Sequence, residues 1–221
     1  DLGASERARL KIFQRRLDDL DFQGYNPFGM VSIMQDRVYL KPTPEELWRH
    51  LARRGMVFVD GRRLDQVELY QELGRRDSAF WCEHDGLTIH VRLPGDADPS
   101  QHAVELAIQE QVFAPRTRGL SYIRIKGISF EHAANAFPVP QRGMVSMSRG
   151  HHWIIEDCVL KHANGVALDI GAQDWNMEPP GVIGQAIVRR NHIDDVGVCG
   201  IAGMAVQNTL IEFNLIEHVG Y

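Results

Sequence analysis

Apolar and polar positions recur in the same order four times in the second half of the chain. Each ten-residue window has apolar residues at its first and sixth positions and a polar residue at its eighth, and the windows start at Ile125, Ile155, Val188 and Ile211. They are rich in β-branched residues and lack an apolar stripe at helical spacing, which favours strands. Short units of this kind bury their apolar side by stacking on one another, so the pattern predicts a solenoid of parallel strands.

Like positions of the windows should lie above one another when such coils stack. We expect an apolar column at the sixth position, made of Phe130, Leu160, Ile193 and Ile216. A polar column is expected at the eighth position, made of His132, His162, Asp195 and His218. At the fourth position we expect two stacked asparagines, Asn191 and Asn214. The polar column could be a metal site or a proton relay. We favour simple stacking, because coils lie only about 4.8 Å apart and Asp195 interrupts the histidines. We therefore predict no metal site and no cofactor.

A second strand follows each of the first three windows, in the stretches GMVSMS from Gly143, GVALDI from Gly165 and GIAGMA from Gly200. Side chains alternate between the two faces of a strand. We expect the core-facing residues of the middle stretch to be Val166, Leu168 and Ile170. Aligning the three glycines places an outward strip of small and apolar residues around one carboxylate: Val145, Met147, Ala167, Asp169, Ala202 and Met204. Such a strip either receives a ligand or is covered by a loop.

Residues 1–115 follow a different pattern. Thr43-Pro44-Glu45-Glu46 combines an N-cap, a proline at the first helical position and a capping box, and it predicts one short helix that stops at Gly55. Strands are expected over residues 56–60 and 87–93, next to Asp-Gly turns, and again from Val104. The first 25 residues fit a helix or a strand. We predict a mainly-β subdomain over residues 1–115, with one short helix, and parallel β-helix coils over residues 116–221.

Composition narrows the class of protein. The chain has 221 residues, of which 44% are hydrophobic and 24% are charged, with a net charge of −5. This balance is ordinary for a globular protein and argues against nucleic acid as a partner. The chain contains no apolar run near the roughly 20 residues that span a bilayer, and it does not open with a signal peptide. Its three cysteines exclude a dense disulfide scaffold.

Several stretches resemble a known family. VFVDGRRL (57–64), FWCEHDGLTIHVRLPGDADP (80–99), FEHAAN (130–135), RGHHWIIE (149–156), LDIG (168–171) and QDW (173–175) are similar to bacterial right-handed parallel β-helix proteins grouped with glycoside hydrolases. Members of that group include α-L-fucosidases and xylanases that act on plant cell-wall polysaccharides. The resemblance covers most of the chain and implies further coils beyond Asp1 and Tyr221. It implies a carbohydrate substrate. The sequence leaves the localisation open, with a secreted protein, extracellular or periplasmic, as the candidate.

The implied fold class is all-β. We predict a right-handed single-stranded parallel β-helix, incomplete and about four coils long, preceded by the mainly-β subdomain. Glycoside hydrolysis uses two carboxyl groups, about 5–9.5 Å apart. We select Asp169 as the first, and Asp174 or Glu178, from the long loop that follows it, as the second.

The same corner of the solenoid offers candidate groups for binding sugar. An exposed indole ring stacks on a sugar face, and amide or imidazole groups bond hydroxyls. The predicted substrate-binding residues are His151, His152, Trp175, Asn176 and Gln207. A purely structural role is the alternative for each: Trp175 packed under its own loop, and the histidine pair capping backbone groups.

Three functions stay open. A glycoside hydrolase acting on plant cell-wall or related polysaccharide is the leading hypothesis. A polysaccharide lyase would use a Lys or Arg base with Ca²⁺ held by clustered acids, and the repeats offer Lys126 and Lys161 but no tight acidic cluster. A non-catalytic carbohydrate-binding or structural β-helix is the third. The sequence leaves the sugar, the linkage and the oligomeric state open.

Overall fold

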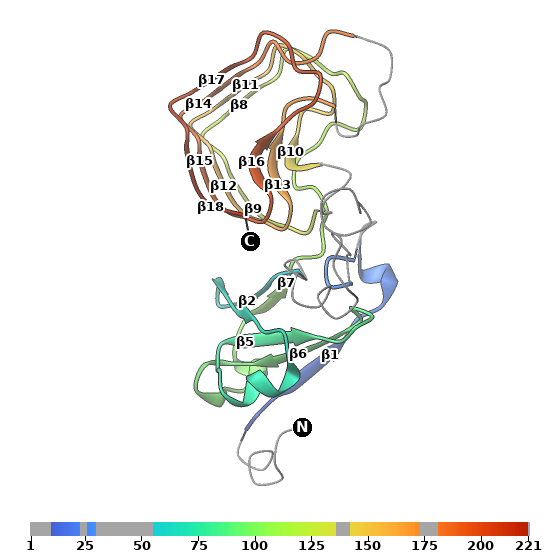
Figure 1. Ribbon diagram of the computed structural model, residues 1–221, viewed down its shortest axis with the longest axis vertical. Coiled ribbons are helices and arrows are strands. Elements are labelled where there is room, and N and C mark those ends of the chain that lie inside the picture. The colour runs from blue at the N-terminus through green and yellow to red at the C-terminus, as the bar shows by residue number, and fades with distance from the viewer. Residues whose placement is uncertain (1–9, 23–25, 30–54, 136–141, 173–180, 221) are drawn as a thin grey trace, which may run out of the picture. The chain divides into compact units, whose positions relative to one another are not determined.

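The computed structural model describes residues 10–22, 26–29, 55–135, 142–172 and 181–220 (Figure 1). The chain forms two compact units, residues 1–108 and residues 109–221, which we call the N-terminal unit and the coil unit. In this division residues 109–115 go with the coils. The described secondary structure is strand, apart from short 3-10 turns at Asp19–Asp21, Tyr70–Gly74, Pro94–Asp96 and Pro99–Gln101. The helix expected after Thr43 lies outside the described residues.

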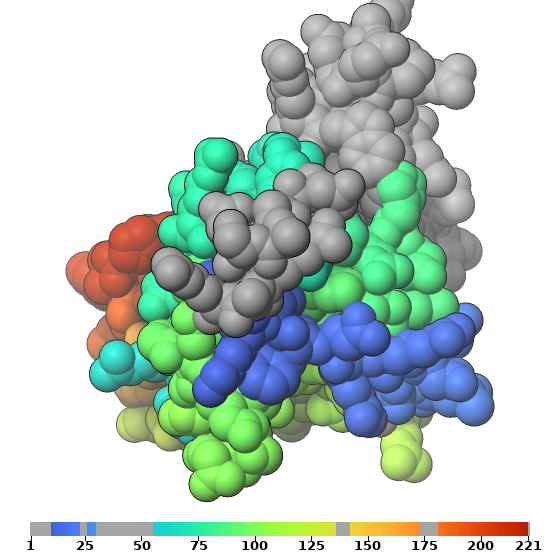
Figure 2. Space-filling view, turned by 90° about the horizontal axis from the view of Figure 1, so that it is seen from below, coloured from blue at the N-terminus to red at the C-terminus, as the bar shows by residue number. Residues whose placement is uncertain are grey.

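The N-terminal unit contains two small sheets. In the first, the order is β1 (Phe13–Arg16), β6 (Thr88–Arg92), β5 (Ala79–Cys82) and β4 (Asp65–Gln66); in the second it is β3 (Arg62–Arg63), β2 (Val57–Val59) and β7 (Val104–Leu106). The strands expected next to the two Asp-Gly turns are present. Within the ambiguous N-terminal stretch, Phe13–Arg16 form a strand, since β1 pairs with β6. Figure 2 shows this segment in blue beside the green of the later part of the unit.

Aromatic and aliphatic side chains fill the core of the N-terminal unit. Phe28 and Phe80 are fully buried, with ring centroids 6.4 Å apart in an edge-to-face arrangement. The turn before β6 needs a glycine, because Gly86 has φ +71° and a Cβ there would meet the backbone nitrogen of Gly29 at 2.3 Å. The segment 26–29 and the β5–β6 hairpin therefore pack backbone against backbone.

The coil unit contains three parallel sheets. Sheet 1 has the order β10 (Gly143–Ser146), β13 (Val166–Asp169), β16 (Cys199–Ala202). Sheet 2 has the order β17 (Leu210–Glu212), β14 (Ile187–Arg189), β11 (Ile154–Glu156), β8 (Arg124–Lys126). Sheet 3 has the order β18 (Leu215–Val219), β15 (His192–Val196), β12 (Val159–Ala163), β9 (Ser129–Ala133). The chain runs from sheet 2 to sheet 3 to sheet 1 and repeats, which is consistent with a parallel β-helix.

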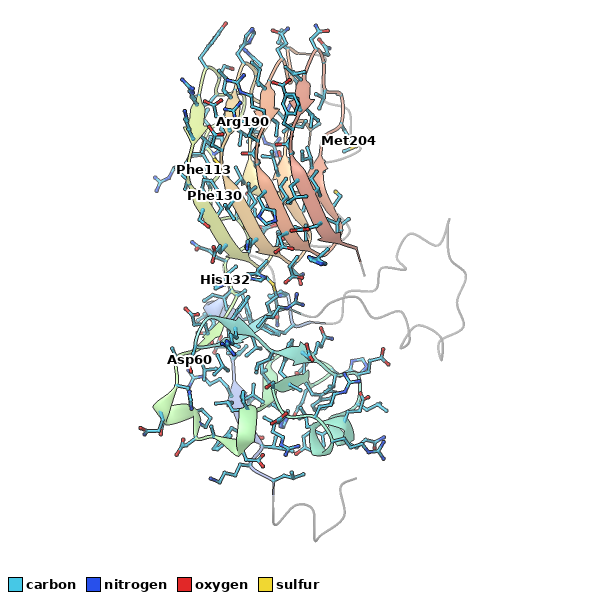
Figure 3. The ribbon with its side chains drawn as sticks, turned by 90° about the vertical axis from the view of Figure 1, so that its left-hand side faces the viewer. Asp60, Phe113, Phe130, His132, Arg190 and Met204 are labelled. Atoms are coloured by element: carbon cyan, nitrogen blue, oxygen red, sulfur yellow. The ribbon has the colours of Figure 1, made fainter. Side chains whose placement is uncertain are left out.

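The predicted columns are confirmed by the strand register. Ile155 pairs with Ile125 and Val188, and Leu160 pairs with Phe130 and Ile193. The first three members of each column enter one buried core, together with Met144, Met147 and Trp153, whereas Ile211 and Ile216 of the last coil are exposed. Figure 3 shows the coils side by side, with Phe113 and Phe130 labelled at one end; their ring centroids are 6.0 Å apart. Each window is thus two strands, one in sheet 2 and the next in sheet 3.

The corner between sheets 2 and 3 has the same length in every coil. Two residues join the strands: Gly127-Ile128, Asp157-Cys158, Arg190-Asn191 and Phe213-Asn214. The first of each pair has a positive φ, between 53° and 67°. The predicted asparagine stack is confirmed here, since Asn191 Nδ2 donates to Asn214 Oδ1 at 2.9 Å. The two asparagines also bond the turning backbone, since Asn191 Oδ1 accepts from Cys158 N at 3.0 Å and Asn214 Nδ2 donates to Val188 O at 2.9 Å.

The backbone conformation explains why the eighth position of each window is polar. His132, His162, Asp195 and His218 all have positive φ, between 49° and 66°. His and Asp tolerate left-handed backbone better than branched apolar residues do. The rings of His132 and His162 lie 5.6 Å apart, and His162 Nδ1 lies 2.7 Å from Asp195 Oδ2. The column thus marks a local twist in each strand of sheet 3.

The buried carboxylate of Glu156, in β11 of sheet 2, pairs with three arginines from the coils on either side. The side chain of Glu156 has no exposed surface. Its Oε1 accepts from Arg124 Nε at 2.9 Å, and its Oε2 accepts from Arg189 Nε at 2.8 Å and Arg190 Nη2 at 2.9 Å. Hydrogen bonds from Arg124, and then from Arg189, lower the pKa of Glu156 to about 2. This carboxylate therefore stays ionised in mild acid and ties three coils together.

Acid is expected to remove the stability that Glu156 contributes. Because the folded-state pKa is depressed, that stability is present above the ordinary pKa of 4.5 and is lost as pH falls toward about 2. We expect the urea midpoint of the wild type to fall across this window. Glu156→Gln should lower the midpoint near neutral pH and flatten its dependence in this range.

Glu212→Gln is the matched control, because Glu212 is half-exposed and lies 3.9 Å from Arg189 Nη1. Its urea midpoint should stay close to that of the wild type at every pH. If the urea midpoint of Glu156→Gln fell with acid as steeply as that of the wild type, Glu156 would not be the cause of the pH dependence.

Candidate functional site

Asp169 ends β13 and is buried. Its Oδ2 accepts a hydrogen bond from the backbone nitrogen of Gly143 at 2.8 Å, which joins β13 to β10 in the neighbouring coil. In sheet 1 it pairs with Ser146 on one side and Ala202 on the other. Gly143 permits this approach, because a Cβ there would meet Asp169 N at 2.4 Å. The carboxylate is therefore held firmly at the end of a strand.

The expected outward strip around Asp169 is wrong. Val145, Met147 and Ala167 have no exposed surface and belong to the core cluster. The register differs too, because Gly143 pairs with Val166, and Val166 with Cys199, so the glycines of the three stretches do not align. Sheet 1 is buried on both faces of β13, as parallel strands often are. The alternation of residues along β13 therefore does not distinguish a buried face from a solvent-exposed one.

The corner between sheets 1 and 2 brings together residues from successive coils. His151 pairs with Gly184, and Gly184 pairs with Gln207. His152 N donates to Gly184 O at 2.9 Å, and Gln207 N donates to Ile183 O at 3.0 Å. The structure thus places His151, His152 and Gln207 on one corner, with a single coil between the histidines and Gln207. Gln207 is exposed and both histidines are half-buried.

Tyr122 joins this corner, and the sequence reasoning missed it. Its ring stacks on His152 with centroids 4.8 Å apart and planes 23° apart, and it meets His151 edge-on at 5.6 Å. Tyr122 is 75% exposed and has φ 61°. The Nδ1 atoms of His151 and His152 lie 2.6 Å apart, so one of them donates to the other. The result is an aromatic platform beside two imidazoles, whose hydrogen-bonding groups suit a polar ligand.

Four predicted site residues lie outside the described residues: Asp174, Trp175, Asn176 and Glu178. Their roles stay predictions, as does the catalytic role of Asp169. Tyr122 carried no sequence signal of its own, because it lies before the first window, which starts at Ile125. Only the stacking of one coil on the next brings it to His152.

The fold defines a class: all-β proteins with parallel sheets stacked in coils. No protein-family model matches the chain, and a search of curated proteins finds no match. Among solved structures, the chain is similar to XylC in complex with xylose, with a TM-score of 0.72 and 21% identity over 95% of this chain and 40% of that chain. The chain spans about two fifths of XylC. This likeness shows a shared fold. No helix among the described residues is long and apolar enough to cross a membrane.

Proposed function

We propose that the chain is part of a glycoside hydrolase with a right-handed parallel β-helix, acting on plant cell-wall or related polysaccharide. The observation that carries the proposal is the stacking of the exposed Tyr122, just before β8, on His152, which lies between β10 and β11. The fold likeness to a protein solved with xylose supports a pentose-containing substrate. An aromatic face for a sugar ring and imidazoles for its hydroxyls are the groups that carbohydrate recognition uses.

The proposed chemistry needs a second carboxyl group besides Asp169. A general acid protonates the leaving oxygen, and a carboxylate acts as nucleophile or as base toward water. Asp169 takes one of these roles, and Asp174 or Glu178, in the loop that follows β13, takes the other. His151 and His152 bind sugar hydroxyls, and Gln207 does so two coils further along the same corner.

Replacing Tyr122 by Ala is expected to weaken binding of xylo-oligosaccharides by about 3–10-fold. An aromatic face contributes roughly 0.5–1.5 kcal/mol beyond buried area. Isothermal titration calorimetry measures the change. Tyr122→Phe keeps the ring and should bind nearly as the wild type does.

Phe213→Ala is the matched control for this experiment. Phe213 is also an aromatic residue at a corner, 82% exposed and with φ 54°, but it has no histidine platform beside it among the ring contacts of the described residues. Its loss should leave binding unchanged. Equal affinities of Tyr122→Ala and the wild type would exclude the platform as the sugar site.

The products of digestion distinguish the three functions. New reducing ends without unsaturation support hydrolysis. An unsaturated uronide product would replace the proposal by a lyase, and saturable binding with no product after long incubation would replace it by a carbohydrate-binding protein.

A further inference from the structure

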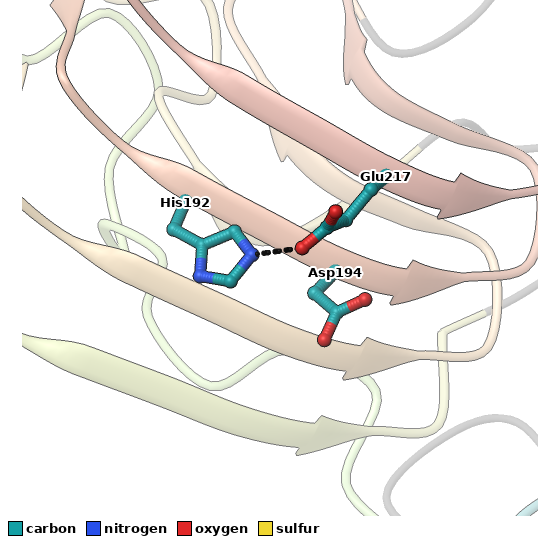
Figure 4. Close-up of side chains that lie close together, drawn as sticks. All are labelled: His192, Asp194 and Glu217. Carbon is teal, nitrogen blue, oxygen red and sulfur yellow. Dashed lines mark hydrogen bonds and ion pairs between the residues drawn. The ribbon is translucent and has the colours of Figure 1, made fainter.

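Three side chains with metal-binding atoms meet on sheet 3, away from the proposed sugar corner. His192 and Asp194 are two residues apart on β15, on either side of the buried Ile193, so they share the outer face of the strand. Asp194 lies directly opposite Glu217 of β18 in the register. One ligand atom from each of the three residues lies within 4.8 Å of the others. Figure 4 shows the three side chains converging from the two strands.

The pairing of Asp194 with Glu217 is unfavourable by itself. Like charges directly opposite on neighbouring strands destabilise a sheet. The structure offsets the repulsion with cations and donors: His192 Nε2 lies 2.7 Å from Glu217 Oε1, His218 Nδ1 lies 2.7 Å from Asp194 Oδ1, and Lys161 Nζ lies 3.8 Å from Asp194 Oδ2. A divalent cation between the two carboxylates would offset the same repulsion more strongly.

We propose that His192, Asp194 and Glu217 bind a divalent transition-metal ion, with Zn²⁺ as the best fit. One imidazole nitrogen and two carboxylate oxygens are ligands that Zn²⁺ accepts at about 2.0–2.2 Å in a tetrahedral site. The ion takes the place of the proton between His192 Nε2 and Glu217 Oε1. Water completes the coordination, since the side chains of His192 and Glu217 are 34% and 41% exposed.

The surrounding residues fit this role. His218 holds Asp194 by one oxygen, which is the kind of outer contact that orients a metal-binding carboxylate. The ligand atoms must close from 4.8 Å to about 3–3.5 Å, the spacing of ligands around tetrahedral Zn²⁺. Partial exposure leaves His192 and Glu217 room to make this adjustment. The bound ion then links β15 to β18 across two successive coils.

Zinc chloride titrated into chelator-treated protein tests the site. We expect one ion per chain by isothermal titration calorimetry, and a rise in Tm on adding zinc, because an ion that binds only the folded state stabilises it. His192→Gln should weaken binding by at least about 10–100-fold and abolish the rise in Tm. Gln can still donate to Glu217, so this variant keeps the contact between the strands.

His162→Gln is the matched control. His162 has the same 2.7 Å contact with a carboxylate, Asp195, in the same sheet, but it belongs to no group of three metal-binding side chains found among the described residues. Its zinc affinity should equal that of the wild type. The proposal is overturned if the wild type shows no saturable binding, or if His162→Gln loses as much affinity as His192→Gln. Circular dichroism of both variants confirms that they remain folded.

Discussion

Asp169→Asn is expected to lower the rate of glycosidic-bond cleavage by about 10²–10⁴-fold while the coils stay folded. The substituted amide keeps the shape of the side chain, and its oxygen can accept the bond from Gly143 N that Asp169 Oδ2 now accepts at 2.8 Å. The amide cannot transfer a proton or form a glycosyl ester at neutral pH. Reducing-sugar release from xylan or a related polysaccharide measures the rate, and thermal unfolding reports the fold. The substitution thus separates the structural role of Asp169 from its proposed catalytic one.

Asp195→Asn serves as the control for this experiment. Asp195 is a half-buried carboxylate of sheet 3, bonded to His162, and it has no part in the proposed chemistry. Turnover should be unchanged. A fully active Asp169→Asn protein would show that Asp169 only joins β10 to β13, and it would remove this residue from the proposed mechanism.

The second large effect is on stability. Asn191→Ala should lower the free energy of unfolding by about 2–6 kcal/mol, because it leaves two buried backbone groups without partners at about 1–3 kcal/mol each. Asn191 Oδ1 accepts from Cys158 N at 3.0 Å, and its Nδ2 donates to Ile155 O at 3.0 Å. A domain is stable by only about 5–15 kcal/mol, so this loss is a large fraction of the total. Urea unfolding followed by circular dichroism measures it.

Asn214→Ala tests the same column one coil later. Asn214 is half-buried, and its Nδ2 donates to Val188 O at 2.9 Å. Water can replace part of what Asn214 supplies, so the loss should be clearly smaller than for Asn191. Equal losses in the two variants would show that burial does not set the contribution of this column.

The sequence predicted the columns because each depends on one residue type at a fixed window position. Ile155, Leu160 and Asn191 were placed correctly, since strands of sheets 2 and 3 are joined by corners of constant length. The same reasoning could not predict the pairing register of the strands in sheet 1. The turn between sheets 3 and 1 differs between coils, so aligned glycines such as Gly143 and Gly165 do not mark paired positions.

The site was harder to predict than the fold. His151 and Gln207 were assigned to one corner from their places in the coils before and after the one that carries Asp169, and the structure stacks them there through Gly184. The burial of Asp169 fits the covered alternative for its strip, but period-two reasoning could not choose between the two alternatives, because both faces of β13 are buried. Tyr122 was missed because a contact between coils leaves no local pattern. The left-handed backbone at His132 and His162 was likewise missed, because the sequence analysis explained the polar eighth position by stacking alone.

The two-residue corner between sheets 2 and 3 has an evolutionary consequence. Every change in coil length along this chain falls at the other two corners, while this one keeps its length in all four coils. One side of the solenoid is thereby closed to insertion, since an added residue would break the asparagine contacts and shift the register of both sheets. The corner that carries Tyr122 and His151 is open to insertion. New loops, and with them new specificities, can arise there without disturbing the stack.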